Sequence, residues 1–226
     1  MATFLIAGDS WSCGEWGHDP YEVKHLGLQY FLEQSGHEVK NISKPGCSNI
    51  VSSSLLEDNL KTGSRYDYIL WFQTDPLRDL RPYNSFKNIV SIEQMKVINK
   101  ARMLITYKKL NNLGVKIYCI GGCYKLSDAI QKFENLHVLI PSVIELCLPK
   151  FNHTLWFSDW IPFLSKDFLD FDELIEIKKM NDNLGSDKEL RHFFYPDGLH
   201  ANRLAHHLIF KVACDQLKLS SVNIHT

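Results

Sequence analysis

A serine near the start of the chain and an acid–histidine pair near its end have the types and spacing that nucleophilic catalysis needs. Ser10 directly follows the apolar run of residues 3–7 and a Gly-Asp dipeptide. Asp197 and His200 stand three residues apart, so that across a turn the carboxylate can bond one nitrogen of the imidazole. The other nitrogen can then take a proton from a serine hydroxyl, which makes that oxygen a nucleophile.

Each half of this pattern also has a purely structural explanation. A Gly-Asp-Ser turn connects a strand to a helix well, with Asp9 or Ser10 as the helix cap. Asp197 can likewise cap a helix, and with ten histidines in the chain His200 can follow it by chance. The early serine and the late acid–histidine pair together are more specific than either alone.

Short apolar runs alternate with longer amphipathic ones, which predicts a doubly wound parallel sheet with crossover helices. In such a sheet ligands bind at the carboxyl ends of the strands, which places Ser10 on the functional edge. The expected strands are residues 3–7, 38–42, 68–72, 115–120 and 136–140. The expected helices are residues 21–34, 50–60, 92–113 and 201–217.

The length of 226 residues suits one domain, with 45% hydrophobic and 23% charged residues as in ordinary globular proteins. Residues 150–190 do not follow the alternation of short apolar and longer amphipathic runs. Aromatic and acidic residues mix there before an expected helix near residues 172–180. We interpret this stretch as an insertion within the single domain 1–226. It can form a lid over the substrate or, the commoner case, a cover for the sheet edge.

Composition excludes several classes of protein. A formal net charge of −1 argues against a nucleic-acid partner. No run approaches the roughly 20 apolar residues that span a bilayer, and no basic segment precedes the first apolar run, so we expect neither a membrane partner nor a signal peptide. The expected location is therefore cytoplasmic, where scattered cysteines stay reduced.

Metal and cofactor chemistry is not expected from this sequence. Cys119 and Cys123 are the only close cysteine pair, but their spacing is not C-x-x-C and no second pair matches it. Buried thiols beside a glycine turn explain the pair better. His206 and His207 follow His200 by about two helical turns, and we interpret them as packed or solvated residues.

In three stretches the chain resembles the GDSL/SGNH hydrolases. Residues 8–10 resemble the first block of that family, residues 45–49 the second and residues 197–200 the last. The resemblance implies a flavodoxin-like five-stranded sheet of order 2-1-3-4-5 with helices on both faces. It also implies a triad of Ser10, His200 and Asp197, with the backbone N–H groups of Ser10 and Gly46 in the oxyanion hole.

The third block departs from the family pattern. Where the family has Gly-x-Asn-Asp, this chain has Thr74 at the Asn position and Asp75 at the Asp position. Losing one oxyanion donor typically costs about 10² to 10³ in rate. Asn49 and Thr74 are equal candidates to replace the asparagine. Gln73 ranks behind them, because it should point to the other face of the strand.

The expected function is that of a serine esterase that removes a small acyl group, with acetyl favoured, without a cofactor. An O-acetylated carbohydrate is one candidate substrate. The rival functions are a non-catalytic binding module for a glycan or protein partner, and an acyltransferase. The possible substrate-binding residues near the serine or at the third block are Asp9, Trp11, Gln73, Asp75 and Arg78. Trp11 and Trp16 could form the walls of the pocket, with packing in the core as an equal alternative. For Arg78 an exposed surface position is the commoner case.

Overall fold

The structure is a computed structural model that describes residues 1–16, 22–74, 79, 92–122, 125–147 and 200–219. Three expectations lie outside the described residues and stay predictions. They are the insertion at residues 150–190 with its helix, the acid Asp197, and the substrate contacts Asp75 and Arg78.

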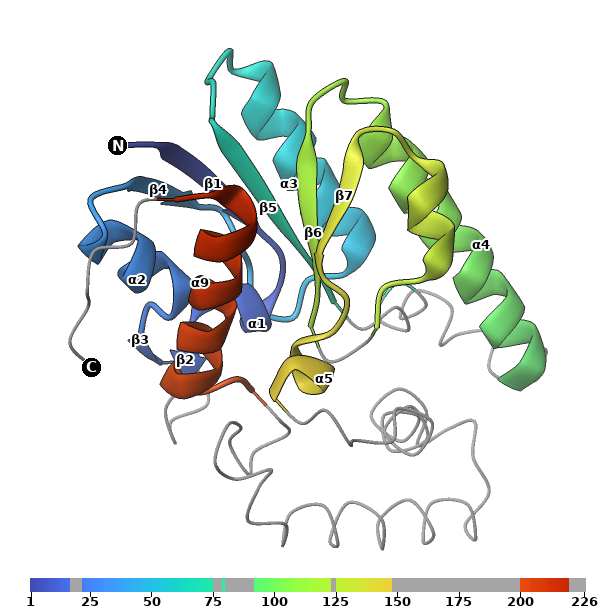
Figure 1. Cartoon of the computed structure of the whole chain (residues 1–226). Helices are drawn as coiled ribbons and strands as arrows, with labels where there is room; N and C mark the ends of the chain where they lie inside the picture. The colour runs from blue at the N-terminus through green and yellow to red at the C-terminus, as the bar shows by residue number, and fades with distance from the viewer. Residues whose placement is uncertain (17–21, 75–78, 80–91, 123–124, 148–199, 220–226) are drawn as a thin grey trace, which may run out of the picture.

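A five-stranded parallel sheet forms the centre of the molecule (Figure 1). Its order is β4-β1-β5-β6-β7, which is 2-1-3-4-5 when these strands are numbered along the chain. This confirms the predicted fold class and strand order. The strands are β1 (Thr3–Ala7), β4 (Glu38–Asn41), β5 (Tyr68–Gln73), β6 (Ile117–Gly121) and β7 (Leu136–Ile140).

Burial explains why the apolar runs became central strands. Phe4, Leu5 and Ile6 of β1 are fully buried, as are Leu70 and Phe72 of β5. Both faces of these strands are covered, and a strand covered on both faces reads as a continuous apolar run. β4 at the sheet edge instead alternates exposed and half-buried residues, as a strand with one open face does.

Helices cover both faces of the sheet (Figure 1). On one face α2 (Leu28–Gln34) and α9 (Arg203–Leu217) pack over Phe4, Ile6 and Phe72. On the other, α3 (Asn49–Lys61) and α4 (Ile92–Asn111) pack over alternate residues such as Leu5 and Trp71. The shorter elements are α1 (Ser10–Cys13), α5 (Val143–Cys147) and a 3₁₀ helix at Asp128–Lys132. Within the described residues, no helix is long and apolar enough to cross a membrane.

The helix expected at residues 21–34 was wrong in its first half. Val23–His25 instead forms β3, which pairs antiparallel with β2 (Glu15–Trp16) in a separate two-stranded sheet. Gly27 has a φ of 57°, outside the right-handed helical region, so the helix begins only at Leu28. The expected helix of residues 201–217 likewise begins two residues later, at Arg203.

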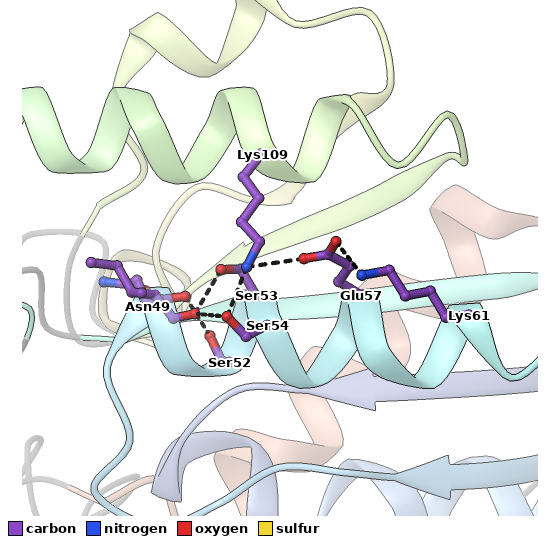
Figure 2. A network of polar contacts seen from close by, with 8 residues as sticks. Asn49, Ser52, Ser53, Ser54, Glu57, Lys61 and Lys109 are labelled. Atoms are coloured by element: carbon purple, nitrogen blue, oxygen red, sulfur yellow. Dashed lines mark hydrogen bonds and ion pairs between the residues drawn. The ribbon is translucent and has the colours of Figure 1, made fainter.

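A polar network joins α3 to α4 at the surface (Figure 2). Lys109 Nζ of α4 donates to Ser54 Oγ at 2.7 Å and lies 3.1 Å from Glu57 Oε2. Glu57 Oε1 also pairs with Lys61 Nζ at 2.7 Å, one helical turn along α3. The network therefore ties together the two helices that cover one face of the sheet.

Candidate active site

Ser10 lies at the carboxyl end of β1, as the first residue of α1. Asp9 caps this short helix, because its Oδ1 accepts from the Trp11 N–H at 3.0 Å. The Asp9 carbonyl accepts from the Ser12 hydroxyl at 2.8 Å. Asp9 and Ser10 are only 1% and 4% exposed. The turn that carries the serine is therefore buried and held by short-range hydrogen bonds.

Gly8 allows this turn to pass close to the neighbouring strand. A Cβ at this position would lie 2.7 Å from the Cβ of Phe72 and would also collide with the Ser12 hydroxyl. Any side chain here would push the turn away from β5. The glycine therefore determines how close the turn that carries Ser10 lies to β5.

His200 reaches Ser10 from the far end of the described chain. Its Nε2 lies 2.9 Å from Ser10 Oγ, although 190 residues separate the two in sequence. Asn202 follows it and caps α9, its Oδ1 accepting from the Leu204 and Ala205 N–H groups at 3.0 and 3.1 Å. The cap fixes where the helix begins, so His200 is held just outside it.

Gly46 lies in a turn that is anchored on the serine segment. The Gly8 carbonyl accepts from the Lys44 N–H and from the Cys47 thiol, both at 3.1 Å. Lys44 and Cys47 also bond to each other through the backbone, at 3.2 Å. The turn around Gly46 is therefore attached two residues before Ser10.

The candidates for the third oxyanion donor all have partners within the protein. The Thr74 hydroxyl donates to Asp9 Oδ2. The Asn49 side chain bonds the backbone of Thr74 twice, accepting from its N–H at 2.9 Å and donating to its carbonyl at 3.2 Å. Gln73 Oε1 accepts from the Tyr107 hydroxyl at 2.6 Å, and burial raises the pKa of Tyr107, which keeps its proton. Two of the candidates therefore bind each other.

Trp11 and Gln73 are both buried beside Gly122. Trp11 is 2% exposed and packs in the core between the sheet and α2. A Cβ on Gly122 would lie 3.5 Å from its ring and 3.1 Å from the Gln73 carbonyl. Asp9, the other predicted substrate contact within the described residues, is bonded to Trp11 and Thr74.

Two sets of contacts near the site were not predicted from the sequence. Asp79 Oδ1 accepts from the Ile50 N–H at 3.0 Å, and burial raises the pKa of this carboxyl. It thereby caps the helix that begins with Asn49. Trp16 contacts both Ser10 and His200. No periodicity indicates either role, because both contacts join segments whose positions only the folded chain determines.

Burial makes the thiols of Cys13 and Cys119 unreactive. Burial, more than the nearby Asp9, raises the pKa of Cys13 to about 12, and burial raises the pKa of Cys119 as well. Such thiols carry little thiolate at neutral pH and are poor nucleophiles. No group of three or more His, Cys, Asp or Glu residues that could hold a metal ion occurs in the described part of the chain.

Comparison with known proteins gives similarity in structure alone. No family model matches the sequence, and the search of curated proteins found no match. TesA shares 16% identity over 96% of this chain and 98% of its own, with a TM-score of 0.44. The esterase EstA from Pseudoalteromonas sp. shares 17% identity over 96% and 97%, with a TM-score of 0.42. A GDSL-like lipase from Parabacteroides merdae shares 13% identity over 97% and 96%, also with a TM-score of 0.42. Of these three solved structures, one is described as an esterase and one as a GDSL-like lipase.

Proposed function

We propose that the protein is a serine hydrolase that cleaves esters, with Ser10 as nucleophile and His200 as general base. The observation that carries the proposal is the 2.9 Å contact between His200 Nε2 and Ser10 Oγ at the carboxyl edge of the sheet. This distance suits direct proton transfer. We assign Asp197 as the residue that orients His200, on the strength of its spacing in the sequence.

The reaction follows from these two groups. His200 takes the Ser10 hydroxyl proton while Oγ attacks the ester carbonyl carbon, giving a tetrahedral oxyanion. The bond to the leaving alcohol then breaks, and the alcohol receives the proton from His200. Water attacks the acyl-enzyme, again losing a proton to His200. The acid leaves, and the proton returns to Ser10.

Backbone N–H groups are the donors best suited to the oxyanion. Ser10 begins α1, and the first N–H groups of a helix have no acceptor within it. Gly46, in the turn anchored on Gly8, supplies the second in this proposal. Because Thr74 and Asn49 donate to protein acceptors, they are poorly placed to serve as the third donor. Gln73 keeps its amide N–H groups, since Tyr107 bonds its oxygen, and it now ranks first.

Burial of the nucleophile favours a small acyl group. Ser10 is 4% exposed, and two buried indoles, those of Trp11 and Trp16, follow it in the chain. A long acyl chain would need a wider approach to Oγ, so we propose acetyl as the group removed. An O-acetylated carbohydrate remains the proposed substrate class.

A binding module on the same fold is the second candidate. The observation that favours it is the bond from Thr74 to Asp9, because the residue at the family's third-donor position is turned to a protein acceptor. In that case the pocket would bind an acylated ligand without cleaving it.

Covalent labelling of Ser10 separates the two candidates. We expect a fluorophosphonate to modify the wild type at Ser10 and to leave Ser10→Ala unmodified, since only an activated serine reacts. The matched control is Ser53→Ala, which removes another buried serine hydroxyl, one bonded to the Ile50 carbonyl at 2.8 Å. It should label at the wild-type rate.

Peptide mass spectrometry locates the adduct, and hydrolysis of p-nitrophenyl acetate gives the parallel activity. If a known serine hydrolase reacts in the same tube while this protein stays unlabelled and inactive, the binding module takes the place of the esterase.

A further inference from the structure

Trp16 contacts the nucleophile segment and the base at the same time. Its indole Nε1 donates to the Ser10 carbonyl at 2.8 Å. Its ring lies against His200, with centroids 5.5 Å apart and planes tilted by 37°. The side chain is 6% exposed, so both contacts are shielded from water. One rigid side chain thus bridges two residues that meet only in the folded protein.

A second contact joins the same strand to the base segment. Glu15 Oε2 lies 3.1 Å from Arg203 Nε, three residues beyond His200. Glu15 and Trp16 form β2, which is held in place by its pairing with β3. Arg203 is 59% exposed, so water screens the ion pair, and its contribution to stability is small. It does, however, restrict how the start of α9 lies on β2.

We propose that Trp16 is a positioning residue for the reaction, and that β2 acts as a clamp that holds His200 against Ser10. This inference rests on the proposed ester hydrolase function. The indole N–H fixes the Ser10 backbone, and the ring fixes the plane of the imidazole. Both reacting residues are therefore held by a side chain that needs no contact with substrate.

The ring also stabilises the charge that forms on His200 during the reaction. An indole face within about 6 Å of a cation attracts it, by about 1 kcal/mol or more when water is excluded. The imidazole is cationic only after it has taken the serine proton, so this attraction favours the transition state over the ground state. Among the described residues, the other charged or titratable groups around this segment include Glu15 on β2, Arg203 and His206 on α9, His25 on β3 and Asp9 beside the serine.

Three variants test the clamp through kcat and KM on p-nitrophenyl acetate. Trp16→Leu removes both contacts and should lower kcat by about 10²-fold with KM changed less than about 3-fold, as for groups that act in the transition state. Trp16→Phe keeps a ring beside His200 but loses the N–H, and should recover to within about 10-fold of the wild type. Glu15→Gln weakens only the outer contact and should cost less than about 3-fold.

Trp71→Phe is the matched control for loss of a buried indole. Trp71 is also fully buried, and its Nε1 donates to the Ser52 hydroxyl at 3.0 Å, on the α3 side of the sheet. This variant should unfold at a lower temperature than the wild type but keep its kcat. A kcat loss in Trp71→Phe equal to that in Trp16→Leu would mean that general loosening explains the effect, and the clamp would be refuted. A loss confined to KM would instead make Trp16 a substrate contact.

Nuclear magnetic resonance tests the clamp even if the protein is no esterase. An indole face shifts the ring protons of a stacked imidazole, so the His200 signals, assigned with His200→Gln, should move in Trp16→Leu. In Trp16→Phe they should move by a smaller amount. Unlabelled Ser10 with this shift intact would reject the hydrolase and keep the clamp, whereas unchanged His200 signals in Trp16→Leu would reject the clamp alone.

Discussion

The two faces of the sheet hold the site by different physical means. On the α3–α4 face, directional polar bonds beside the apolar core hold the end of β5: Asn49 pairs with the Thr74 backbone, and Tyr107 bonds Gln73. On the α2–α9 face, close apolar packing dominates, with Gly27 pressed against the ring of His206. The carboxyl end of β5 is thus positioned by hydrogen bonds, and the helix after His200 by packing. Different changes should therefore destabilise the two faces: loss of a hydrogen-bonding side chain on the α3–α4 face, and acid on the α2–α9 face.

Asn49→Leu should produce the largest loss of stability. The substitution keeps the volume but leaves the N–H and carbonyl of Thr74, a residue 1% exposed, without these partners. Two such buried groups cost about 1–3 kcal/mol each, so we expect a loss of about 4 kcal/mol in the free energy of unfolding by urea denaturation.

Asn99→Leu is the control for that variant. Asn99 is 7% exposed, and its Oδ1 has no hydrogen-bond partner among the described residues. Replacing an unsatisfied polar group by an apolar one is nearly neutral. If the two leucine variants lose equal stability, hydrogen bonding does not hold this face. If Asn49→Leu stays folded but its kcat falls by about 10²-fold or more, Asn49 is again a candidate for the third oxyanion donor.

Acid should weaken the α2–α9 face through His206. Burial lowers the pKa of this histidine to about 4, so the folded protein holds it neutral while the unfolded chain protonates it near its ordinary value of 6.5. The stabilisation is complete above pH 6.5 and is lost as the pH falls towards 4, by about 3 kcal/mol in all. The measurement is urea denaturation of wild type and His206→Gln across this range.

The free-energy difference between those two proteins should shrink as the pH falls. Burial also lowers the pKa of His207, which is only partly buried, so His207→Gln should alter the pH dependence less. A difference that stays constant from pH 7 to 4 would show that His206 does not govern acid stability.

Lys109→Met should have the smallest effect. It removes the contacts of Lys109 with Ser54 and Glu57, but this network lies at the surface, where water screens ion pairs (Figure 2). The thermal midpoint should fall less than in Asn49→Leu, and 1 M salt should reduce the difference further. A drop as large as that of Asn49→Leu would show that surface pairs, rather than buried bonds, join α3 to this face.

The sequence predicts the sheet well because its central strands are covered on both faces and so carry continuous apolar runs. Any doubly wound sheet produces such runs, so no knowledge of particular tertiary contacts is needed to predict these strands. The start of α2 was not predictable in this way, because residues 23–25 form a strand only through their pairing with Glu15 and Trp16. The positive φ of Gly27 that ends this stretch is likewise set by contact with α9.

The site residues also differ in whether the sequence alone could predict them. Chemical reasoning alone selected Ser10 and His200, which the fold brings within hydrogen-bond distance. The triad, including Asp197, stays a prediction. The ranking of the oxyanion donors depended on hydrogen bonds that no spacing reveals, since Asn49 and Thr74 bond each other across 25 residues. Trp16 had been considered only as a pocket or core residue, because its contacts with Ser10 and His200 form only in the folded chain.

The 190-residue separation of Ser10 and His200 has a consequence for biosynthesis. β1 pairs with β4 and β5. The strands on both sides of the serine turn can therefore form once about the first third of the chain has left the ribosome. The histidine emerges 190 residues after the serine, and contacts between distant segments form slowly. We therefore expect a nascent chain to carry an inert serine for most of its synthesis. For the proposed hydrolase, reactivity towards esters would then report that α9 has docked.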